Sequence, residues 1–409
     1  MTYALTNYLK AALLIPALLV CCSAARADES APAGFSRAPE WSAGVELAPA
    51  FVPHTNPYLK GENPSGKAVD AQFSADLRAA FRFNPATREG VLYRGAYQCI
   101  GLGFNGFSTG KLLGSPVSAY VFQGAPIVTF SPRMWLGYEW QFGAAFGWKH
   151  YAAGDGEDDV YEYNAAVSTP VTAAMGIALK LHYELTPRWQ LSVAATARHY
   201  SNGNTSIPNG GVNSLGASLG IAYVLNPARD AASGIDEAAL TSEADRRGWI
   251  YDITLYGAWR KRIVAIGEPA ERELCPGRFG VVGAIFSPLY KLNRYVAVGP
   301  AVQLRWDESA GITPYWVSGS YDDNMKFERP PFGKQLSAGL SAHAELTMPI
   351  FTLNAGLGYD ILCPVGDKRF FQTLTLKTFV TRNVYINTGY RLGNFKDPQN
   401  LMLGLGVRL

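Results

Sequence analysis

Residues 400–409 read Asn-Leu-Met-Leu-Gly-Leu-Gly-Val-Arg-Leu, and their large aliphatic side chains recur at every second position. Successive side chains of a β-strand point to opposite faces, so a strand here would carry leucines and a valine on one face. The other face would carry small or polar residues. Strands of membrane-spanning barrels are divided in this way, with the apolar face toward lipid and the other toward the lumen. The segment therefore predicts a transmembrane β-strand.

The same alternation recurs along the chain in about 16 segments of roughly 10–15 residues each. Some connections between the segments are long, whereas others are tight turns, and the two kinds mostly alternate. Long extracellular loops and short periplasmic turns are the rule in outer-membrane barrels, and an even strand count returns both termini to the periplasm. The predicted strands lie near residues 40–52, 71–83, 91–106, 116–126, 133–149, 168–184, 188–201, 212–225, 249–263, 277–288, 293–306, 334–347, 350–361, 369–380, 383–392 and 400–409.

The composition fits such a barrel and excludes other classes of protein. Charged residues make up 17% of the chain, against about 25% in a typical soluble protein. No run of 18 apolar residues occurs, which excludes a membrane-spanning helix. The net charge of +3 without a basic run gives no support for nucleic-acid binding. We therefore predict an all-β fold, a transmembrane antiparallel β-barrel of about 16 strands.

The chain divides into two halves that resemble each other. A polar, helix-prone stretch at 226–247 interrupts the strands, and we expect it to be a periplasmic linker between halves at 28–225 and 248–409. Aligning Leu191 with Val384 places Arg198 opposite Arg391, both on the lumen side. Two architectures fit this pattern, a single barrel or two fused eight-stranded barrels. The rarity of fused barrels favours the single barrel.

The N-terminal residues predict export from the cytoplasm. Lys10 precedes an apolar run at 11–22, and a cleavage-site pattern ends at Ala27, so residues 1–27 are expected to be a signal peptide. Cys21 and Cys22 leave open a lipoprotein, although Val20 fits that signal poorly.

The remaining cysteines give no clear chemistry. Cys275 and Cys363 could form a disulfide in an oxidising compartment or remain free thiols. The sequence shows no metal-ligand pattern, and we expect no cofactor.

The residues with catalytic potential lie around 198–213. His199 and Ser201 are two positions apart and therefore share a face of their strand, the face that also carries Val193 and is expected to meet lipid. Asn213 lies on the lipid face of the next strand, and the intervening loop returns it beside His199. Polar groups facing lipid are costly unless they have a function. A serine near a histidine that a third group orients is the arrangement of an activated nucleophile.

The order His199-Tyr200-Ser201-Asn202, then Pro208-Asn209-Gly210-Gly211-Val212-Asn213, resembles the signature of the PagL-type lipid A 3-O-deacylases. These are eight-stranded outer-membrane barrels with a lipid-facing site, and the resemblance covers roughly residues 40–225. It implies that Ser201 is the nucleophile and His199 the general base. Asn202 and Gly203 would lie at the oxyanion and substrate position, and lipid A or lipopolysaccharide would be the substrate.

Two features depart from the family pattern. Asn213 stands at the family's acid position, where an amide can accept the imidazole N–H but cannot offset the charge of an imidazolium. Gly203-Asn204 follows Ser201-Asn202 where a small residue and then a glycine are expected, which leaves the oxyanion donors open.

The sequence thus predicts a lipid A deacylase in the outer membrane of a Gram-negative bacterium. Two alternatives remain: a non-catalytic porin-like or structural barrel, and an esterase or phospholipase acting on other outer-leaflet lipids. Leu392 and Asn394 occupy the places of His199 and Ser201, so the second half is expected to be inert. A homodimer is left open.

Other polar features are expected to have no catalytic role. The acidic stretch at 155–159 is read as a solvated loop in preference to a site for a divalent ion. For the remaining histidines the sequence indicates no nucleophile or ligand set: His54, His150, His182 and His343.

Overall fold

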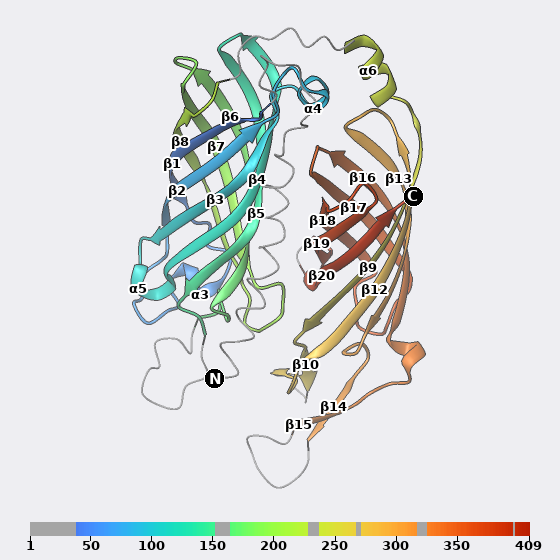
Figure 1. The fold of residues 1–409 in the computed structure, drawn as a ribbon. Coiled ribbons are helices and arrows are strands. Elements are labelled where there is room, and N and C mark those ends of the chain that lie inside the picture. The colour runs from blue at the N-terminus through green and yellow to red at the C-terminus, as the bar shows by residue number, and fades with distance from the viewer. Residues whose placement is uncertain (1–37, 152–163, 228–236, 267–270, 317–324, 396) are drawn as a thin grey trace, which may run out of the picture. The chain divides into compact units, whose positions relative to one another are not determined.

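In a computed structural model, which describes residues 38–151, 164–227, 237–266, 271–316, 325–395 and 397–409, the chain forms two closed antiparallel barrels of eight strands each (Figure 1). The first barrel closes where β8 pairs with β1, with Ile221 opposite Val45. The second closes where β20 pairs with β9, with Leu405 opposite Leu255. The all-β membrane-barrel prediction is confirmed, whereas the preference for one large barrel was wrong, because each half closes on itself.

The sixteen predicted segments correspond to the sixteen barrel strands. The first barrel contains β1 (Glu40–Phe51), β2 (Ala71–Arg82), β3 (Tyr97–Phe107), β4 (Gly114–Ser131), β5 (Met134–Trp148), β6 (Val171–Glu184), β7 (Trp189–Ser201) and β8 (Val212–Val224). The second contains β9 (Gly248–Arg260), β12 (Phe279–Lys291), β13 (Val296–Asp307), β16 (Leu336–Thr347), β17 (Phe351–Leu362), β18 (Phe370–Phe379), β19 (Val384–Gly393) and β20 (Asp397–Arg408).

The connections also contain short elements that the strand pattern did not predict. Two small hairpins belong to long loops of the second barrel, β10 (Ile263–Ile266) with β11 (Glu271–Leu274) and β14 (Thr313–Trp316) with β15 (Met325–Glu328). The helices are α3 (Pro57–Lys60), α4 (Arg88–Leu92), α5 (Gly110–Leu113), α6 (Glu237–Ala244) and the 3₁₀ turn η2 (Phe332–Gln335). Helix α6 lies in the stretch that the sequence identified as helix-prone.

Each barrel has a loop end, where its long connections lie, and a turn end, where its connections are mostly tight. In the first barrel the loop end carries residues 52–70, 108–113, 149–151, 164–170 and 202–211. In the second barrel it carries residues 261–266, 271–278, 308–316 and 325–335, as well as residues 363–369 and 394–395 of two shorter connections. One connection at the turn end, residues 83–96 with α4, is longer than predicted.

The outer surface is apolar and the lumen is polar, as the alternation predicts. On β7 and β8 the outward side chains Val193 and Leu219 are 54% and 60% exposed. Inside the first barrel, Lys180 Nζ lies 2.7 Å from Glu46 and 3.2 Å from Glu139. Buried charges are tolerated only when they are paired in this way, so the ion pairs offset the cost of burying these charges in the lumen.

The second lumen is filled on the same plan. Lys377 pairs with Asp252 at 2.6 Å and also with Glu345, while Arg391 pairs with Asp360 at 2.5 Å. Arg391 lies on the seventh strand of its barrel, as Arg198 does on β7, and both point inward, as predicted from the alignment of the two halves.

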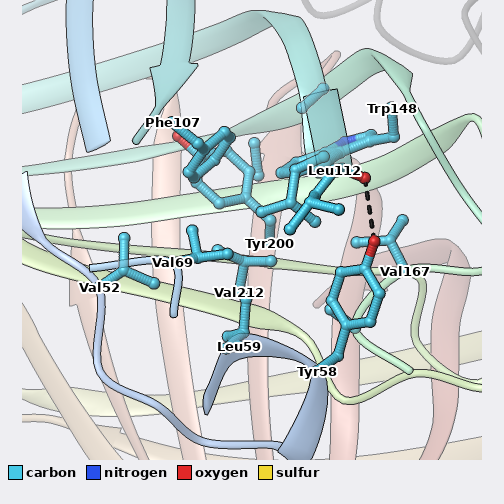
Figure 2. Packing of buried hydrophobic residues seen from close by; sticks show 14 residues of the cluster. Val52, Tyr58, Leu59, Val69, Phe107, Leu112, Trp148, Val167, Tyr200 and Val212 are labelled. Carbon is cyan, nitrogen blue, oxygen red and sulfur yellow. Dashed lines mark hydrogen bonds between the residues drawn. The ribbon is translucent and has the colours of Figure 1, made fainter. Parts of the chain in front are cut away.

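A hydrophobic cluster closes the loop end of the first barrel (Figure 2). It joins side chains from three loops to the inward-facing Tyr200, the second-last residue of β7, and Val212, the first residue of β8. Tyr58 on α3 donates a hydrogen bond to the carbonyl of Leu112 at 3.3 Å. The cluster therefore fixes the loops against the two strands that carry the predicted site.

Several sequence expectations concern features outside the barrels. The signal peptide and the acidic stretch at 155–159 lie outside the described residues. Cys99, Cys275 and Cys363 are free thiols, so the bridge between Cys275 and Cys363 is not formed. Within the described ranges, no helix is long and apolar enough to cross a membrane.

Candidate functional site

Strands β7 and β8 bring His199 and Asn213 directly opposite each other. The two residues are partners in the antiparallel ladder, and His199 Nδ1 lies 2.7 Å from Asn213 Oδ1. Because an amide oxygen can only accept a hydrogen bond, the Nδ1 proton belongs to His199 in this contact. Nε2 of the neutral ring is then left with a lone pair, which is the state that a general base requires.

Ser201 lies on the same outer face as His199, two residues further along β7. The rise of about 3.3 Å per residue places its Cα roughly 6.6 Å from that of His199. Tyr200, between them, points inward and is 2% exposed. Its hydroxyl accepts a hydrogen bond from Gln72 and donates one to Asn105, each at 3.1 Å, and its ring lies edge-on to Trp148. Fixing Tyr200 inside the barrel holds its two neighbours on the outside.

Hydrogen bonds made by Asn202 and Asn209 hold the loop that follows Ser201. The main-chain N–H of Asn202 donates to Asn209 Oδ1 at 3.1 Å, and the Asn202 side-chain amide donates to Ser168 Oγ at 3.0 Å. Asn209 therefore positions the residue that follows the candidate nucleophile. Asn202 and Gly203, the predicted oxyanion residues, follow Ser201 directly in the sequence, just after the end of β7.

Two neighbouring loops hold the other end of this segment, at Gly210 and Gly211, by hydrogen bonds. Asn56 donates from Nδ2 to the carbonyl of Gly211 at 3.1 Å, and its Oδ1 caps α3 by accepting from Leu59 N. The N–H groups of Gly210 and Gly211 donate to main-chain carbonyls of residues 165 and 166. Sequence reasoning missed Asn56 and Ser168. An Asn before a Pro does signal a helix cap, but it gives no sign of a contact with a loop 155 residues away.

Gly211 lies against the histidine ring. Its φ is +68°, a backbone conformation that side chains disfavour, and a Cβ at this position would lie 3.2 Å from His199 Cε1. A side chain at 211 would therefore strain the loop backbone and press on the ring of His199.

One expectation about the second barrel was wrong. His343, for which the sequence indicated no nucleophile, has Nε2 3.0 Å from Ser341 Oγ and Nδ1 2.9 Å from Asn354 Oδ1. All three side chains are buried in the lumen, where Gln303 also donates to Ser341. This group resembles a serine triad in its atoms, but it faces the filled interior and not the lipid side, so we interpret it as part of the lumen network.

Two protein-family models match the chain, one on each barrel. A model described as lipid A 3-O-deacylase (PagL) matches residues 174–222, which include His199, Ser201 and Asn213. A model described as the C-terminal domain of acyloxyacyl hydrolase, named for PagL, matches residues 249–409. The resemblance expected only for residues 40–225 thus extends to the second barrel. No curated protein matches the chain.

Solved structures that match the chain include the outer-membrane enzyme PagL, with 14% identity and a TM-score of 0.29 over 43% of this chain and 97% of that one. Neisserial surface protein A matches with 14% identity and a TM-score of 0.28, over 45% of this chain and 96% of its own. A mutant of the Rh. blastica porin matches with 10% identity and a TM-score of 0.18, over 91% and 100%.

The two matched family segments together make up just over half of the chain, and they fall on separate barrels with the apolar outer surfaces described above. The chain is therefore an outer-membrane β-barrel protein that belongs to the PagL-type lipid A 3-O-deacylase family.

Proposed function

We propose that this protein hydrolyses an ester-linked acyl chain of lipid A, with Ser201 as the nucleophile, His199 as the general base and Asn213 as the group that orients His199. The observation that carries the proposal is the 2.7 Å contact between His199 Nδ1 and Asn213 Oδ1 on a face shared with Ser201. In this proposal residues 28–225 carry the site, residues 226–247 link the barrels, and residues 248–409 form a barrel without catalytic residues.

The chemistry follows from the protonation state of His199. Nε2 takes the hydroxyl proton as Ser201 Oγ attacks the ester carbonyl, and the same proton passes to the departing sugar oxygen when the ester bond breaks. Water then attacks the acyl-serine, again losing its proton to His199, and the free fatty acid is released. Each step needs donors for the oxyanion, and we assign this role to the segment Asn202-Gly203.

The outward direction of the site fits a substrate that lies in the membrane. Ser201 pairs with Ala173 and His199 pairs with Met175 on the neighbouring β6, so the face beside the site is apolar. We place the loop end at the cell exterior, which puts the site at the level of the outer leaflet. A lipid whose acyl chains lie along the barrel would then reach Ser201 without leaving the membrane.

Mass spectrometry of lipid A from cells expressing the wild type or Ser201→Ala tests the proposal. We expect the wild type to remove one hydroxyacyl chain and the variant to leave lipid A intact. A matched control is Ser192→Ala, which alters another serine of β7 on the lumen side. Intact lipid A in wild-type cells, with the barrel folded in the outer membrane, would contradict the proposal.

A panel of outer-leaflet lipids distinguishes the remaining esterase alternative. Purified wild-type protein should release fatty acid from lipid A and leave diacyl phospholipids unchanged. Release from phospholipid at an equal or higher rate would assign the site to a phospholipase instead.

A further inference from the structure

The chain folds into two compact units, and the boundary between them falls inside the loop that follows β7. The tip of this loop, Gly203–Ile207, belongs to the same unit as residues 242–409. Asn202 and Pro208, on either side of the tip, belong to the other unit. Contacts within the second unit therefore reach the chain two residues after Ser201, at the segment Asn202-Gly203 that carries the proposed oxyanion donors.

Two hydrogen bonds fix Asn204 within the second unit. Its side-chain amide donates from Nδ2 to the carbonyl of Pro398, near the start of β20, at 2.7 Å. Its own carbonyl accepts a hydrogen bond at 3.0 Å from the main-chain N–H of Lys261, the residue after β9. Strands β9 and β20 are neighbours in the barrel. Adjacent strands therefore hold both the side chain and the main chain of Asn204.

Gly203 lies on the outer face of the same strands. A Cβ at this position would lie 2.5 Å from Leu401 Cδ2 and 3.2 Å from Tyr390 Cε2. Tyr390 and Leu401 are opposite each other in the ladder of β19 and β20. Their neighbours Arg391 and Met402 are fully buried in the lumen, so Tyr390 and Leu401 point outward. A side chain at 203 would displace either Leu401 or the loop tip.

The backbone of the loop tip is left-handed at its first two residues, with φ of +64° at Gly203 and +61° at Asn204. Glycine adopts this conformation freely, and asparagine is one of the few other residues that tolerate it. The direction of the Gly203 N–H relative to the rest of the loop tip depends on this φ. The contacts with Pro398 and Leu401 therefore also fix the N–H that follows Asn202 in the chain.

We propose that Pro398 and Leu401 are positioning residues for the oxyanion segment Asn202-Gly203, acting through Asn204 and Gly203. Neither residue needs to touch the substrate. An oxyanion donor stabilises the transition state most when it is held in place before the reaction, and these contacts hold the Gly203 N–H. The proposal rests on the proposed function, and it gives strands β19 and β20 a part in hydrolysis although their barrel carries no catalytic residue.

Asn204→Gly separates the contact with Pro398 from the backbone conformation. Glycine keeps the left-handed conformation, and it is also the residue that the family pattern has at this position. We expect Asn204→Gly to lower kcat for lipid A about three- to tenfold and to leave KM within about twofold, since the hydrogen bond to Pro398 is lost. Wild-type kcat in this variant would overturn the proposal.

A double variant tests the contact with Leu401. We expect Gly203→Ala to lower kcat about tenfold or more, and Gly203→Ala/Leu401→Ala to recover about threefold or more of that loss, because the added methyl group then has room. The matched control is Leu403→Ala, which shortens the next outward leucine of β20 and should give no recovery. Absence of recovery with Leu401→Ala, or equal recovery with Leu403→Ala, would contradict the proposal.

Hydrogen exchange at Lys261 measures the same contact without catalysis. In full-length Ser201→Ala protein in nanodiscs, Gly203→Ala should accelerate exchange of the Lys261 amide about tenfold or more, since the carbonyl of Asn204 no longer accepts its proton. Unchanged exchange would overturn the proposed contact. If wild-type protein leaves lipid A intact, the proposed function fails and the positioning role fails with it. If wild-type protein hydrolyses lipid A and Asn204→Gly is fully active, only the positioning role fails.

Discussion

Asn213 holds His199 with a neutral oxygen where a carboxylate would also balance the positive charge that forms on the ring. We predict that Asn213→Asp increases the rate of deacylation by about tenfold or more, because an ionised partner stabilises the imidazolium better than an amide does. Asn213→Leu should lower the rate by at least about a hundredfold, since Nδ1 loses its acceptor. Single-turnover release of fatty acid from lipid A measures both.

The same assay in a Ser201→Ala background is the control for Asn213→Asp, and it should show no release. If Asn213→Leu hydrolyses lipid A as fast as the wild type, the contact between His199 and Asn213 has no role in catalysis.

Gly211 offers a second test at the level of single residues. We predict that Gly211→Ala lowers deacylation by about tenfold or more, because a Cβ there would lie 3.2 Å from His199 Cε1 and would displace the ring. Gly66→Ala is the matched control, since Gly66 has a φ of +63° but no atom within 4 Å of an added Cβ. Both variants strain the backbone alike, so an equal loss of activity in the two would show that contact with His199 is not the cause.

The lipid-side position of His199, Ser201 and Asn213 could be predicted from the sequence, since side-chain direction in a strand depends only on the parity of the position. The contacts that hold the site in place could not be predicted from the sequence. Asn56 and Ser168 reach it from other loops, and such contacts depend on how the loops fold over the barrel. The contact between Ser341 and His343 was also missed, although the two share a face, because polar side chains are ordinary on the lumen side of a barrel strand.

At the level of elements, long strands were predicted and short ones were not. The barrel strands have 10–18 residues, enough for the alternation to repeat several times. The hairpin strands of β10–β11 and β14–β15 have four residues each, too few for the period to be recognised. Helix α6 was recognisable because its polar residues lack a period of two.

An ion pair fixes the residue that follows α6. Asp245 accepts hydrogen bonds from the side chain and the main chain of Arg294 in the turn between β12 and β13, and these lower the pKa of Asp245 to about 2. The unfolded value is about 3.9, so the ionised pair stabilises the attachment above pH 4, and this stabilisation is lost as the pH falls toward 2.

We predict that Asp245→Asn frees this segment at neutral pH. Trypsin should then cleave after Arg246 or Arg247 several times faster than in the wild type, while the barrel strands stay intact. Hydrogen exchange of residues 242–247 in the wild type should accelerate between pH 4 and pH 2 beyond the intrinsic pH dependence of exchange. Unchanged cleavage in the variant would show that other contacts hold the segment.

At the scale of the whole molecule, the closure of the barrels is the feature that the sequence left open. Alternation is the same in a strand of an eight-stranded or a sixteen-stranded barrel, so it does not specify which strands meet. Closure depends on pairs such as Ser42 with Val224, which lie far apart in the chain. The size of the inward side chains does indicate small barrels. Large buried side chains such as Arg305 and Arg391 can fill the narrow lumen of an eight-stranded barrel.

Filled lumens lead to a prediction that separates this protein from a porin. In the described part of the first barrel, Arg198 pairs with Asp76 at 2.8 Å, nearer the loop end than the ion pairs of Lys180. In the second barrel, the ion pairs of Lys377 and Arg391 join different strands across the interior. Eight strands leave an interior that side chains alone can fill, so no continuous water path is expected. Purified protein in planar bilayers should give no stable conductance steps at protein-to-lipid ratios where an open porin gives many. Conductance steps that persist after the protein is purified again would show that a lumen opens. They would favour a porin-like channel over a barrel with a filled lumen that carries a lipid-facing site.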